Sequence, residues 1–214
     1  FPVTNGTCVR SLASDAATGR IFVGAQGEAG YFSPDEQGRL RYQSLNALLP
    51  ENERSYGDVW DIAAFQNSYF FRTNDRVFRF DGQKMSVVYH QGLLEQLGAV
   101  NGQLLLHSSA QGLMRFNGRE FETVCAAPPG IITAFLPWKS DTVLITTLKN
   151  GIFSLINGQV AAWNTSADVF LKEKRIYSAT IFNNDQIALG TTLGGLVVLE
   201  ANRRPRIWLR KGMG

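Results

Sequence analysis

The stretch Gly19-Arg20-Ile21-Phe22-Val23-Gly24-Ala25 decides the fold, because its form returns four more times along the chain. Each copy has a turn residue, a polar residue, three apolar residues, a variable residue and a small residue. The other copies are Asn67 to Thr73, Gly102 to Ser108, Asp141 to Thr147 and Asp185 to Thr191. A period of about 40 residues indicates that one supersecondary unit is stacked several times.

Each repeat predicts four short strands. The first strand is a further apolar stretch before each copy, as in Ile131 to Leu136, and the copy itself is the second strand. A third strand follows the copy and is usually opened by glycine, as in Gly112 to Phe116. A fourth stretch then ends the repeat, as in Gln159 to Trp163. Asp81-Gly82, Asn117-Gly118 and Asn157-Gly158 separate the third strand from the fourth, and such pairs predict two-residue type I′ turns.

The apolar triplets in the copies distinguish between β architectures. A sheet with one wet face alternates apolar and polar residues, whereas Ile21-Phe22-Val23, Leu104-Leu105-Leu106 and Val143-Leu144-Ile145 place apolar groups on both faces. Sheets covered on both sides, repeated along the chain, predict an all-β propeller of five four-stranded antiparallel blades. A two-sheet sandwich is the structural alternative, but it explains neither the repeat nor the triplets.

The whole chain, residues 1–214, is therefore expected to be one propeller segment. We expect two short helical interruptions between blades. Ser44 to Pro50 spaces leucines at i, i+3 and i+4, opens on Ser and stops at Pro, and Ser166 to Lys172 is expected to form another turn or two before the fifth blade. The blades are placed approximately at residues 7–45, 57–90, 93–125, 130–163 and 175–210.

Composition limits the classes of function. The chain is 44% hydrophobic and carries a net charge of +3, which is typical of a globular domain with a substantial core. Cys8 and Cys125 are expected to be free buried thiols, because neither belongs to a metal-binding or redox spacing. No stretch of these residues has the apolar length of a membrane span, and Phe1-Pro2-Val3 lacks the pattern of a signal peptide, so we expect neither within this sequence. The basic cluster near Arg203, Arg204, Arg206, Arg210 and Lys211 lacks an aromatic platform, so we expect no nucleic-acid partner.

Catalytic and metal-binding motifs are missing from the sequence. His90 and His107 are the two histidines, and neither has metal-ligand spacing. No nucleophile elbow, phosphate-binding loop or zinc-protease motif occurs. We therefore predict no catalytic residues, no metal, no cofactor and no enzymatic activity, with a propeller polysaccharide lyase or glycosidase as the alternative.

Binding residues are expected where propellers usually meet their ligands, at the loops around one end of the central channel. Those loops here combine fixed charges with aromatic rings, which suits a polar ligand such as a carbohydrate fragment or a peptide. The candidate ligand-binding residues are Glu28, Arg54, Tyr56, Asp58, Trp60, Arg76, Lys149, Arg175 and Tyr177. Asp58 and Trp60 also have a structural interpretation, as a turn acceptor and as a filler between neighbouring sheets.

Several phrases resemble those of a known family. Val9-Arg10-Ser11-Leu12, followed by Gly19 to Gly24, is similar to the repeat of two-component regulator propellers. Gly24 to Tyr31, Leu48-Leu49-Pro50 and Gly57-Asp58-Val59-Trp60 resemble more narrowly the sensor propellers of Bacteroidetes-type hybrid and triple-tyrosine regulators. The resemblance covers essentially the whole chain.

The resemblance implies a fold and a role. It implies a seven-bladed ring, of which these five blades would be a part. It also implies that the chain is a ligand-sensing region of a bacterial signal-transduction regulator. This region would lie on the periplasmic or extracellular side of the inner membrane, and downstream modules would anchor the parent protein in that membrane. A protein-interaction scaffold is a further alternative.

The chain ends suggest self-association. Phe1-Pro2-Val3 reads as the tail of a preceding blade, and Lys211 to Gly214 reads as a link into a sixth blade. An excised arc would expose apolar sheet faces, and large bare patches are rare in soluble monomers. We therefore expect the first and fifth blades to bury their outer faces against another copy of the chain, in a symmetric dimer.

Overall fold

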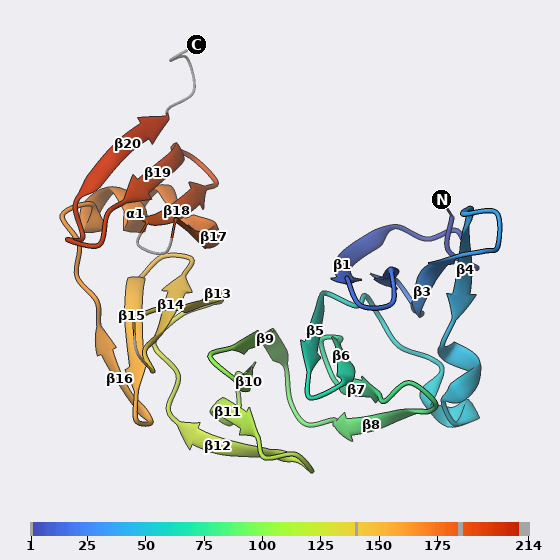
Figure 1. The fold of residues 1–214 in the computed structure, drawn as a ribbon. Coiled ribbons are helices and arrows are strands. Elements are labelled where there is room, and N and C mark those ends of the chain that lie inside the picture. The colour runs from blue at the N-terminus through green and yellow to red at the C-terminus, as the bar shows by residue number, and fades with distance from the viewer. Residues whose placement is uncertain (1, 140, 184–185, 210–214) are drawn as a thin grey trace. The chain divides into compact units, whose positions relative to one another are not determined.

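A computed structural model describes residues 2–139, 141–183 and 186–209 of the chain. Its strands form five antiparallel sheets of four strands each, and every sheet is built from consecutive strands in chain order (Figure 1). We call these sheets blades 1 to 5.

The first three blades have the following strands. Blade 1 contains β1 (Val9–Asp15), β2 (Arg20–Ala25), β3 (Glu28–Pro34) and β4 (Leu40–Ser44). Blade 2 contains β5 (Asp61–Phe65), β6 (Ser68–Arg72), β7 (Val77–Phe80) and β8 (Met85–Tyr89). Blade 3 contains β9 (Leu94–Val100), β10 (Gln103–Ser108), β11 (Gly112–Phe116) and β12 (Phe121–Cys125).

The last two blades follow the same plan. Blade 4 contains β13 (Ile132–Pro137), β14 (Val143–Thr147), β15 (Gly151–Ile156) and β16 (Gln159–Ala162). Blade 5 contains β17 (Ile176–Phe182), β18 (Gln186–Thr191), β19 (Gly195–Leu199) and β20 (Pro205–Leu209). Asp185, which opens the last sequence repeat, lies outside the described residues.

The chain divides into two compact units, Phe1–Glu122 and Thr123–Gly214, and the division falls within β12. In the first unit one apolar cluster, which includes Phe22, Phe71 and Phe78, fills the space between blades 1 and 2. A second cluster, which includes Phe70 and Leu104, fills the space between blades 2 and 3. Apolar side chains between facing sheets thus stack these three blades.

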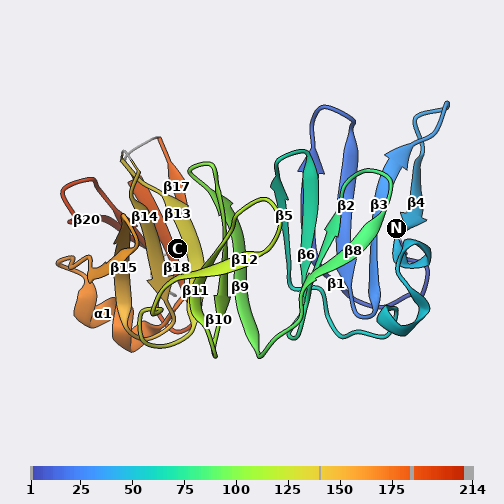
Figure 2. The same ribbon diagram turned by 90° about the horizontal axis from the view of Figure 1, so that it is seen from below.

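The second unit has one main core, between blades 4 and 5. Leu144 and Ile152 from blade 4 meet Ile187 and Val197 from blade 5, together with Leu171 of helix α1 (Asp168–Lys174). Helix α1 lies beside β15, on the connection between the two blades (Figure 2).

The second strands are buried on both faces, which explains their apolar triplets. Leu104, Leu105 and Leu106 are fully buried, although neighbouring side chains point to opposite faces of the sheet. The same holds for Val143, Leu144 and Ile145 within their own unit.

The expected seven-bladed ring is wrong, because this structure is a propeller of five blades. The number seven came from the resemblance alone, and no residue pattern supported it. Each sequence repeat completes its own sheet from consecutive strands, so five repeats give five blades and leave no described strand outside a blade.

The predicted two-residue turns are present at one of three positions. Asn157 and Gly158 connect paired Ile156 and Gln159 directly, with φ angles of 50° and 77°. The loops that begin at Asp81 and at Asn117 are longer, because Phe80 pairs with Met85 and β12 begins only at Phe121. In each, the first side chain accepts hydrogen bonds from backbone N–H groups two and three residues ahead, and this Asx turn closes the loop.

The two helical interruptions and the cysteines differ in detail from expectation. The first interruption is only a turn of 3₁₀ helix, η1 (Asn46–Leu48), followed by η2 (Glu51–Glu53), and the second is α1. Both cysteines are free, but Cys8 is exposed and Cys125 is only partly buried, so the prediction of two buried thiols is wrong. Val3 lies outside any strand and packs against Val23 and Phe32 of blade 1. Phe1, Arg210 and residues 211–214, on which the expectation about the chain ends rests, lie outside the described residues.

Candidate functional site

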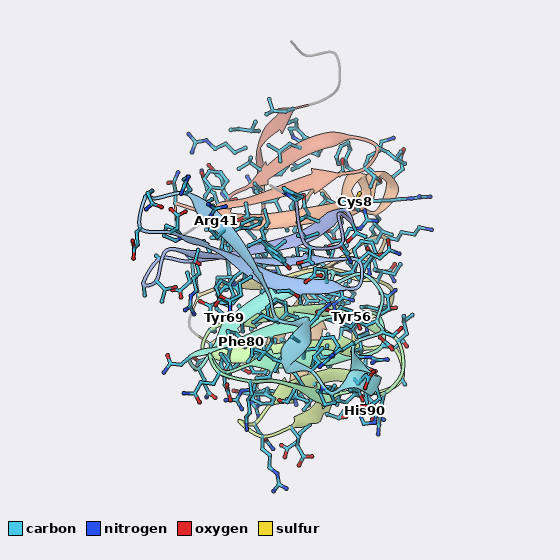
Figure 3. The ribbon with its side chains drawn as sticks, turned by 90° about the vertical axis from the view of Figure 1, so that its right-hand side faces the viewer. Cys8, Arg41, Tyr56, Tyr69, Phe80 and His90 are labelled. Atoms are coloured by element: carbon cyan, nitrogen blue, oxygen red, sulfur yellow. The ribbon has the colours of Figure 1, made fainter. Side chains whose placement is uncertain are left out.

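The candidate site lies at one end of the blades. Because successive strands alternate in direction, the link into strand one, the connection between strands two and three, and the exit of strand four share one end of each sheet. Figure 3 shows this arrangement in the first unit. Tyr56 and His90 lie toward one end of the blades, whereas Arg41, Tyr69 and Phe80 lie toward the other.

A pocket of about 350 Å³ opens at this end of blade 2. It combines η2, the connection from β6 to β7, the exit of β8 and the link into β9. Its lining residues are Glu53, Asp75, Arg76, Val87, His90 and Gly92. We call it the blade 2 pocket.

Arg76 is the central charged group of the blade 2 pocket. Its Nε and Nη2 atoms donate to Oδ2 of Asp75 at 3.1 and 2.7 Å, and Nη1 donates to Oε2 of Glu53 at 2.9 Å. The guanidinium is thus held between two carboxylates from different segments. Such a clamp fixes the positions of all three side chains.

The turn that carries Asp75 and Arg76 is shaped by Thr73. The Thr73 hydroxyl donates to Oδ1 of Asp75 at 2.7 Å and accepts from the backbone N–H groups of Asp75 and Arg76 at 3.3 and 3.1 Å. Thr73 is fully buried, so its side chain anchors the turn in the interior of the protein. Local side-chain to backbone bonds of this kind hold a turn in one conformation.

The hydrogen bonds of the pocket favour the ionised form of Asp75. Partial burial raises the pKa of Asp75, but the hydrogen bonds from Arg76 and Thr73 outweigh it, and the net pKa lies below the ordinary value. The bond to Asp75 likewise raises the pKa of Arg76 above its ordinary value, against the effect of burial. Two carboxylates and one guanidinium leave the pocket with one negative charge while His90 is neutral.

Glu28, a predicted site residue, is buried in blade 1 with 4% of its surface exposed. Its Oε1 atom accepts hydrogen bonds from the hydroxyls of Tyr42 at 3.0 Å and Ser44 at 2.5 Å. Burial, followed by the charge of Glu28, raises the pKa of Tyr42 far above its ordinary value. The carboxylate therefore joins β3 to β4.

Arg54 and Tyr56 hold the segment between blades 1 and 2. Arg54 donates to the carbonyl oxygens of Leu49 and Ala47 at 2.9 and 3.1 Å. The Tyr56 hydroxyl donates to Asn46, and its ring lies 4.9 Å from that of Phe78. Burial and the nearby Glu28 raise the pKa of Tyr56.

Asp58 and Trp60 are brought together by Arg10, which sequence reasoning did not select. Nε of Arg10 donates to Oδ1 of Asp58 at 2.9 Å, and the guanidinium carbon lies 5.3 Å from the centre of the Trp60 ring. Trp60 is 40% exposed. This trio joins the first strand of blade 1 to the entrance of blade 2 and leaves an indole surface open to solvent.

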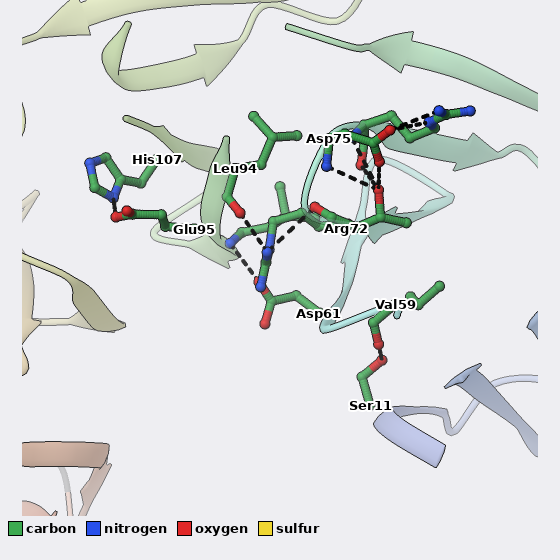
Figure 4. A network of polar contacts seen from close by, with 11 residues as sticks. Ser11, Val59, Asp61, Arg72, Asp75, Leu94, Glu95 and His107 are labelled. Atoms are coloured by element: carbon green, nitrogen blue, oxygen red, sulfur yellow. Dashed lines mark hydrogen bonds and ion pairs between the residues drawn. The ribbon is translucent and has the colours of Figure 1, made fainter. Parts of the chain in front are cut away.

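A second polar network ties blade 2 to blade 3 (Figure 4). Oδ2 of Asp61 accepts from Nε of Arg72 at 2.5 Å and from the backbone N–H of Leu97 at 2.8 Å, while Arg72 Nη1 donates to the Leu94 carbonyl at 2.8 Å. Ser11 makes the corresponding tie from blade 1, donating to the Val59 carbonyl at 2.8 Å.

His107 lies in the same network, where Nδ1 is 2.9 Å from Oε2 of Glu95 without the alignment of a formed hydrogen bond (Figure 4). Burial lowers the pKa of His107, and the charge of Glu95 offsets this effect only in part.

The remaining predicted residues are in the second unit, at the same end of their blades. Lys149 is exposed in the turn between β14 and β15. Arg175 is exposed directly after α1, and Tyr177 is exposed near the start of β17. Only Arg76 of the nine candidates lines the blade 2 pocket, and the other roles remain predictions.

Sequence reasoning missed most of the pocket. Asp75 adjoins the predicted residue Arg76, whereas Glu53 is not among the candidates and His90 enters the sequence analysis only as a possible metal ligand. The direction of the fourth strand is a signal that could have found His90, because that strand exits beside the connection that carries Arg76. Nothing in the sequence placed η2 next to that connection.

Within residues 2–139, 141–183 and 186–209, no three His, Cys, Asp or Glu side chains are close enough to hold a metal ion. The helices in this part of the chain are also too short and too polar to cross a membrane.

The stacked blades and the pocket in their loops define a β-propeller protein with a candidate binding site. No protein-family model matches the sequence, and no curated protein matches it. The fold is similar to that of a virginiamycin B lyase from Staphylococcus aureus, with TM-score 0.75, 10% identity, and coverage of 100% of this chain and 73% of that chain.

Two further solved structures share the fold. YCF48 bound to D1 peptide has TM-score 0.69 and 10% identity, over 98% of this chain and 71% of that chain. PorZ, a surface component of the type-IX secretion system of Porphyromonas gingivalis, has TM-score 0.69 and 13% identity, over 96% of this chain and 28% of that chain. At these identities the comparisons support the propeller fold, but they do not single out the two-component regulator propellers.

Proposed function

We propose that this chain is a ligand-binding propeller without catalytic activity, and that it serves as a sensory region of a bacterial signal-transduction regulator. The observation that supports binding is the blade 2 pocket, in which four segments meet around about 350 Å³ of open space and two of them contribute the charged side chains Glu53, Asp75 and Arg76. Concave sites with a few fixed polar groups are the usual form of a small-ligand site.

The pocket favours a polar ligand, such as a carbohydrate fragment or the end of a peptide. All three nitrogen atoms of Arg76 are already engaged with Glu53 and Asp75. Oε1 of Glu53 is the one carboxylate oxygen of the pocket that neither Arg76 nor Thr73 engages, and as an acceptor it would hold a hydroxyl or amino group of a ligand.

The lowered pKa of Asp75 disfavours a role for this residue as a general acid in hydrolase or lyase chemistry. A general acid needs a pKa near the working pH, whereas the pKa of Asp75 is lowered by Arg76 and Thr73. A carboxylate bonded by an arginine on one oxygen and by a threonine hydroxyl on the other suits the positioning of a ligand better than the delivery of a proton. The sensory role, the periplasmic or extracellular location and a membrane-anchored parent protein rest on the family resemblance of the sequence.

A panel of oligosaccharides and short peptides tests this proposal by calorimetry with the purified chain. We expect binding of at least one panel member, weakened about tenfold or more in Arg76→Gln and Glu53→Gln. Arg41→Gln is the matched control, because Arg41 is an exposed partner of Asp35 in the first unit and lies toward the other end of the blades (Figure 3). It should bind as tightly as the native chain.

Chromatography of the same mixtures tests the absence of catalysis. The bound glycan should be recovered unchanged after prolonged incubation. Turnover that is abolished by Glu53→Gln or Asp75→Asn would identify an enzyme instead.

A further inference from the structure

Three cationic side chains gather at one end of the second unit. Lys149 lies in the turn between β14 and β15, Lys172 lies in the last turn of α1, and Arg175 directly follows that helix. The Cε atom of Lys172 comes within 3.2 Å of the position that a Cβ would take on Gly151, immediately after the turn that holds Lys149. Three segments thus contribute to one basic surface.

These cations are not neutralised by neighbouring acids. Arg10, Arg72 and Arg76 each contact a carboxylate, and Lys174 pairs with Glu173 at 2.5 Å. No ion pair within the described part of the chain involves Lys149, Lys172 or Arg175. A lysine in the last turn favours the helix dipole, which accounts for Lys172, but it does not account for the other two cations.

Exposed apolar side chains lie on segments that adjoin those of the cations. Ile131, Tyr177 and Leu193 are 52%, 70% and 64% exposed. The backbone fixes their places, because the carbonyl of Ile131 accepts from the N–H of Leu148, and the N–H of Leu193 donates to the carbonyl of Lys174. Tyr177 stands two residues after Arg175, and Ile176 between them is fully buried and anchors the strand.

We propose that this surface, formed by Lys149, Lys172, Arg175, Ile131, Tyr177 and Leu193, binds an acidic segment of a protein partner. The unpaired cations would attract carboxylates and orient the segment. Burial of the aliphatic side chains against apolar side chains of that segment would contribute binding free energy. A nucleic acid or an acidic polysaccharide would meet the cations but would offer Ile131 and Leu193 no aliphatic partner, so an acidic peptide fits the whole surface better.

The test is fluorescence anisotropy with a short labelled peptide in which glutamates flank a central Leu-Phe pair. We expect binding that weakens as salt is added. The triple variant Lys149→Gln, Lys172→Gln, Arg175→Gln should weaken it about tenfold or more. Its melting temperature should equal that of the native chain, because all three side chains are exposed.

A matched control removes the same charge elsewhere. Lys84→Gln, Arg119→Gln and Arg204→Gln together change three exposed cations away from this surface and should leave affinity within about twofold. Leu193→Ser should weaken binding of the Leu-Phe peptide but not of an all-glutamate peptide. Equal loss in the control triple, stronger competition by duplex DNA or polygalacturonate than by the peptide, or no binding at all would overturn the proposal.

Discussion

Gly158 is one residue whose conformation the sequence specifies alone. It follows Asn157 in the two-residue turn between β15 and β16, where both residues have positive φ angles. Asn and Gly tolerate this conformation because a short polar side chain or no side chain relieves the clash with the backbone. Gly30 is constrained for a different reason, since a Cβ there would overlap the carbonyl oxygen of Gln43 on the neighbouring strand.

Replacing Gly158 by Val should therefore destabilise the chain by about 1–2 kcal/mol, since a β-branched residue resists a φ of 77°. Thermal or urea unfolding measures this change. Gly57→Ala is the control, because a Cβ at Gly57 meets nothing within 4 Å and its φ is not in the left-handed region. An unchanged unfolding midpoint for Gly158→Val would show that this turn is not formed.

Polar ties between successive blades act at the scale of whole elements. Ser11 connects β1 to the entrance of blade 2, and Asp61 connects β5 to blade 3 through the N–H of Leu97. The two residues hold equivalent places in their strands, opposite Gly24 and Arg72 respectively. Blades 1 and 2 are thus each held to the following blade by a side chain at the start of their first strand, in addition to the apolar core.

The two ties should differ in strength. Asp61→Ala leaves the buried guanidinium of Arg72 without its carboxylate, so we expect a loss of about 3 kcal/mol in unfolding free energy. Ser11→Ala removes one neutral hydrogen bond and should cost about 1 kcal/mol.

Glu173→Ala is the control for this comparison, because it removes an exposed carboxylate paired with Lys174 and should change stability by less than about 1 kcal/mol. A smaller loss for Asp61→Ala than for Ser11→Ala would contradict the assignment of Asp61 as the stronger tie.

For the whole molecule, His107 should make stability depend on pH. Its pKa is lowered in the folded chain by burial, so the unfolded chain takes up a proton at higher pH than the folded chain does. Stability is then fully present above the ordinary histidine pKa of about 6.5 and is lost as the pH falls toward the folded value.

The melting temperature should consequently decline between about pH 7 and pH 5, and the decline should be smaller in His107→Gln. His90→Gln, which changes the exposed histidine, should decline as the native chain does. Equal declines in all three proteins would contradict a role for His107.

Self-association is also a property of the whole molecule. Trp208 packs against the core between blades 4 and 5, so its neighbours Ile207 and Leu209 point to the opposite face of blade 5, where they are 40% and 53% exposed. We expect a second copy of the chain to cover this face.

Light scattering should accordingly give the mass of a dimer. Ile207→Lys with Leu209→Lys should give the monomer, whereas Val169→Lys on the exposed side of α1 should not change the mass. A monomer at all concentrations of the native chain would contradict this expectation.

The sequence by itself determined the secondary structure and the class of fold. The repeated triplet with its flanking glycines specifies four strands and two buried faces per repeat, and these are local properties that neighbouring residues decide. The Asn157-Gly158 turn is local in the same way. The blade count read from the repeats holds, whereas the count borrowed from resemblance fails.

Only the tertiary structure decided the candidate site. Glu53, Arg76 and His90 are separated along the chain and meet because η2, a strand connection and a strand exit share one end of blade 2. The sequence predicts both Glu28 and Arg76 as charged ligand-binding residues. In the structure Glu28 is buried and hydrogen-bonded to hydroxyl groups, whereas Arg76 lines a pocket. The burial of a side chain and its ion pairs depend on contacts between segments that are distant in the sequence, and a pattern of neighbouring residues does not predict those contacts.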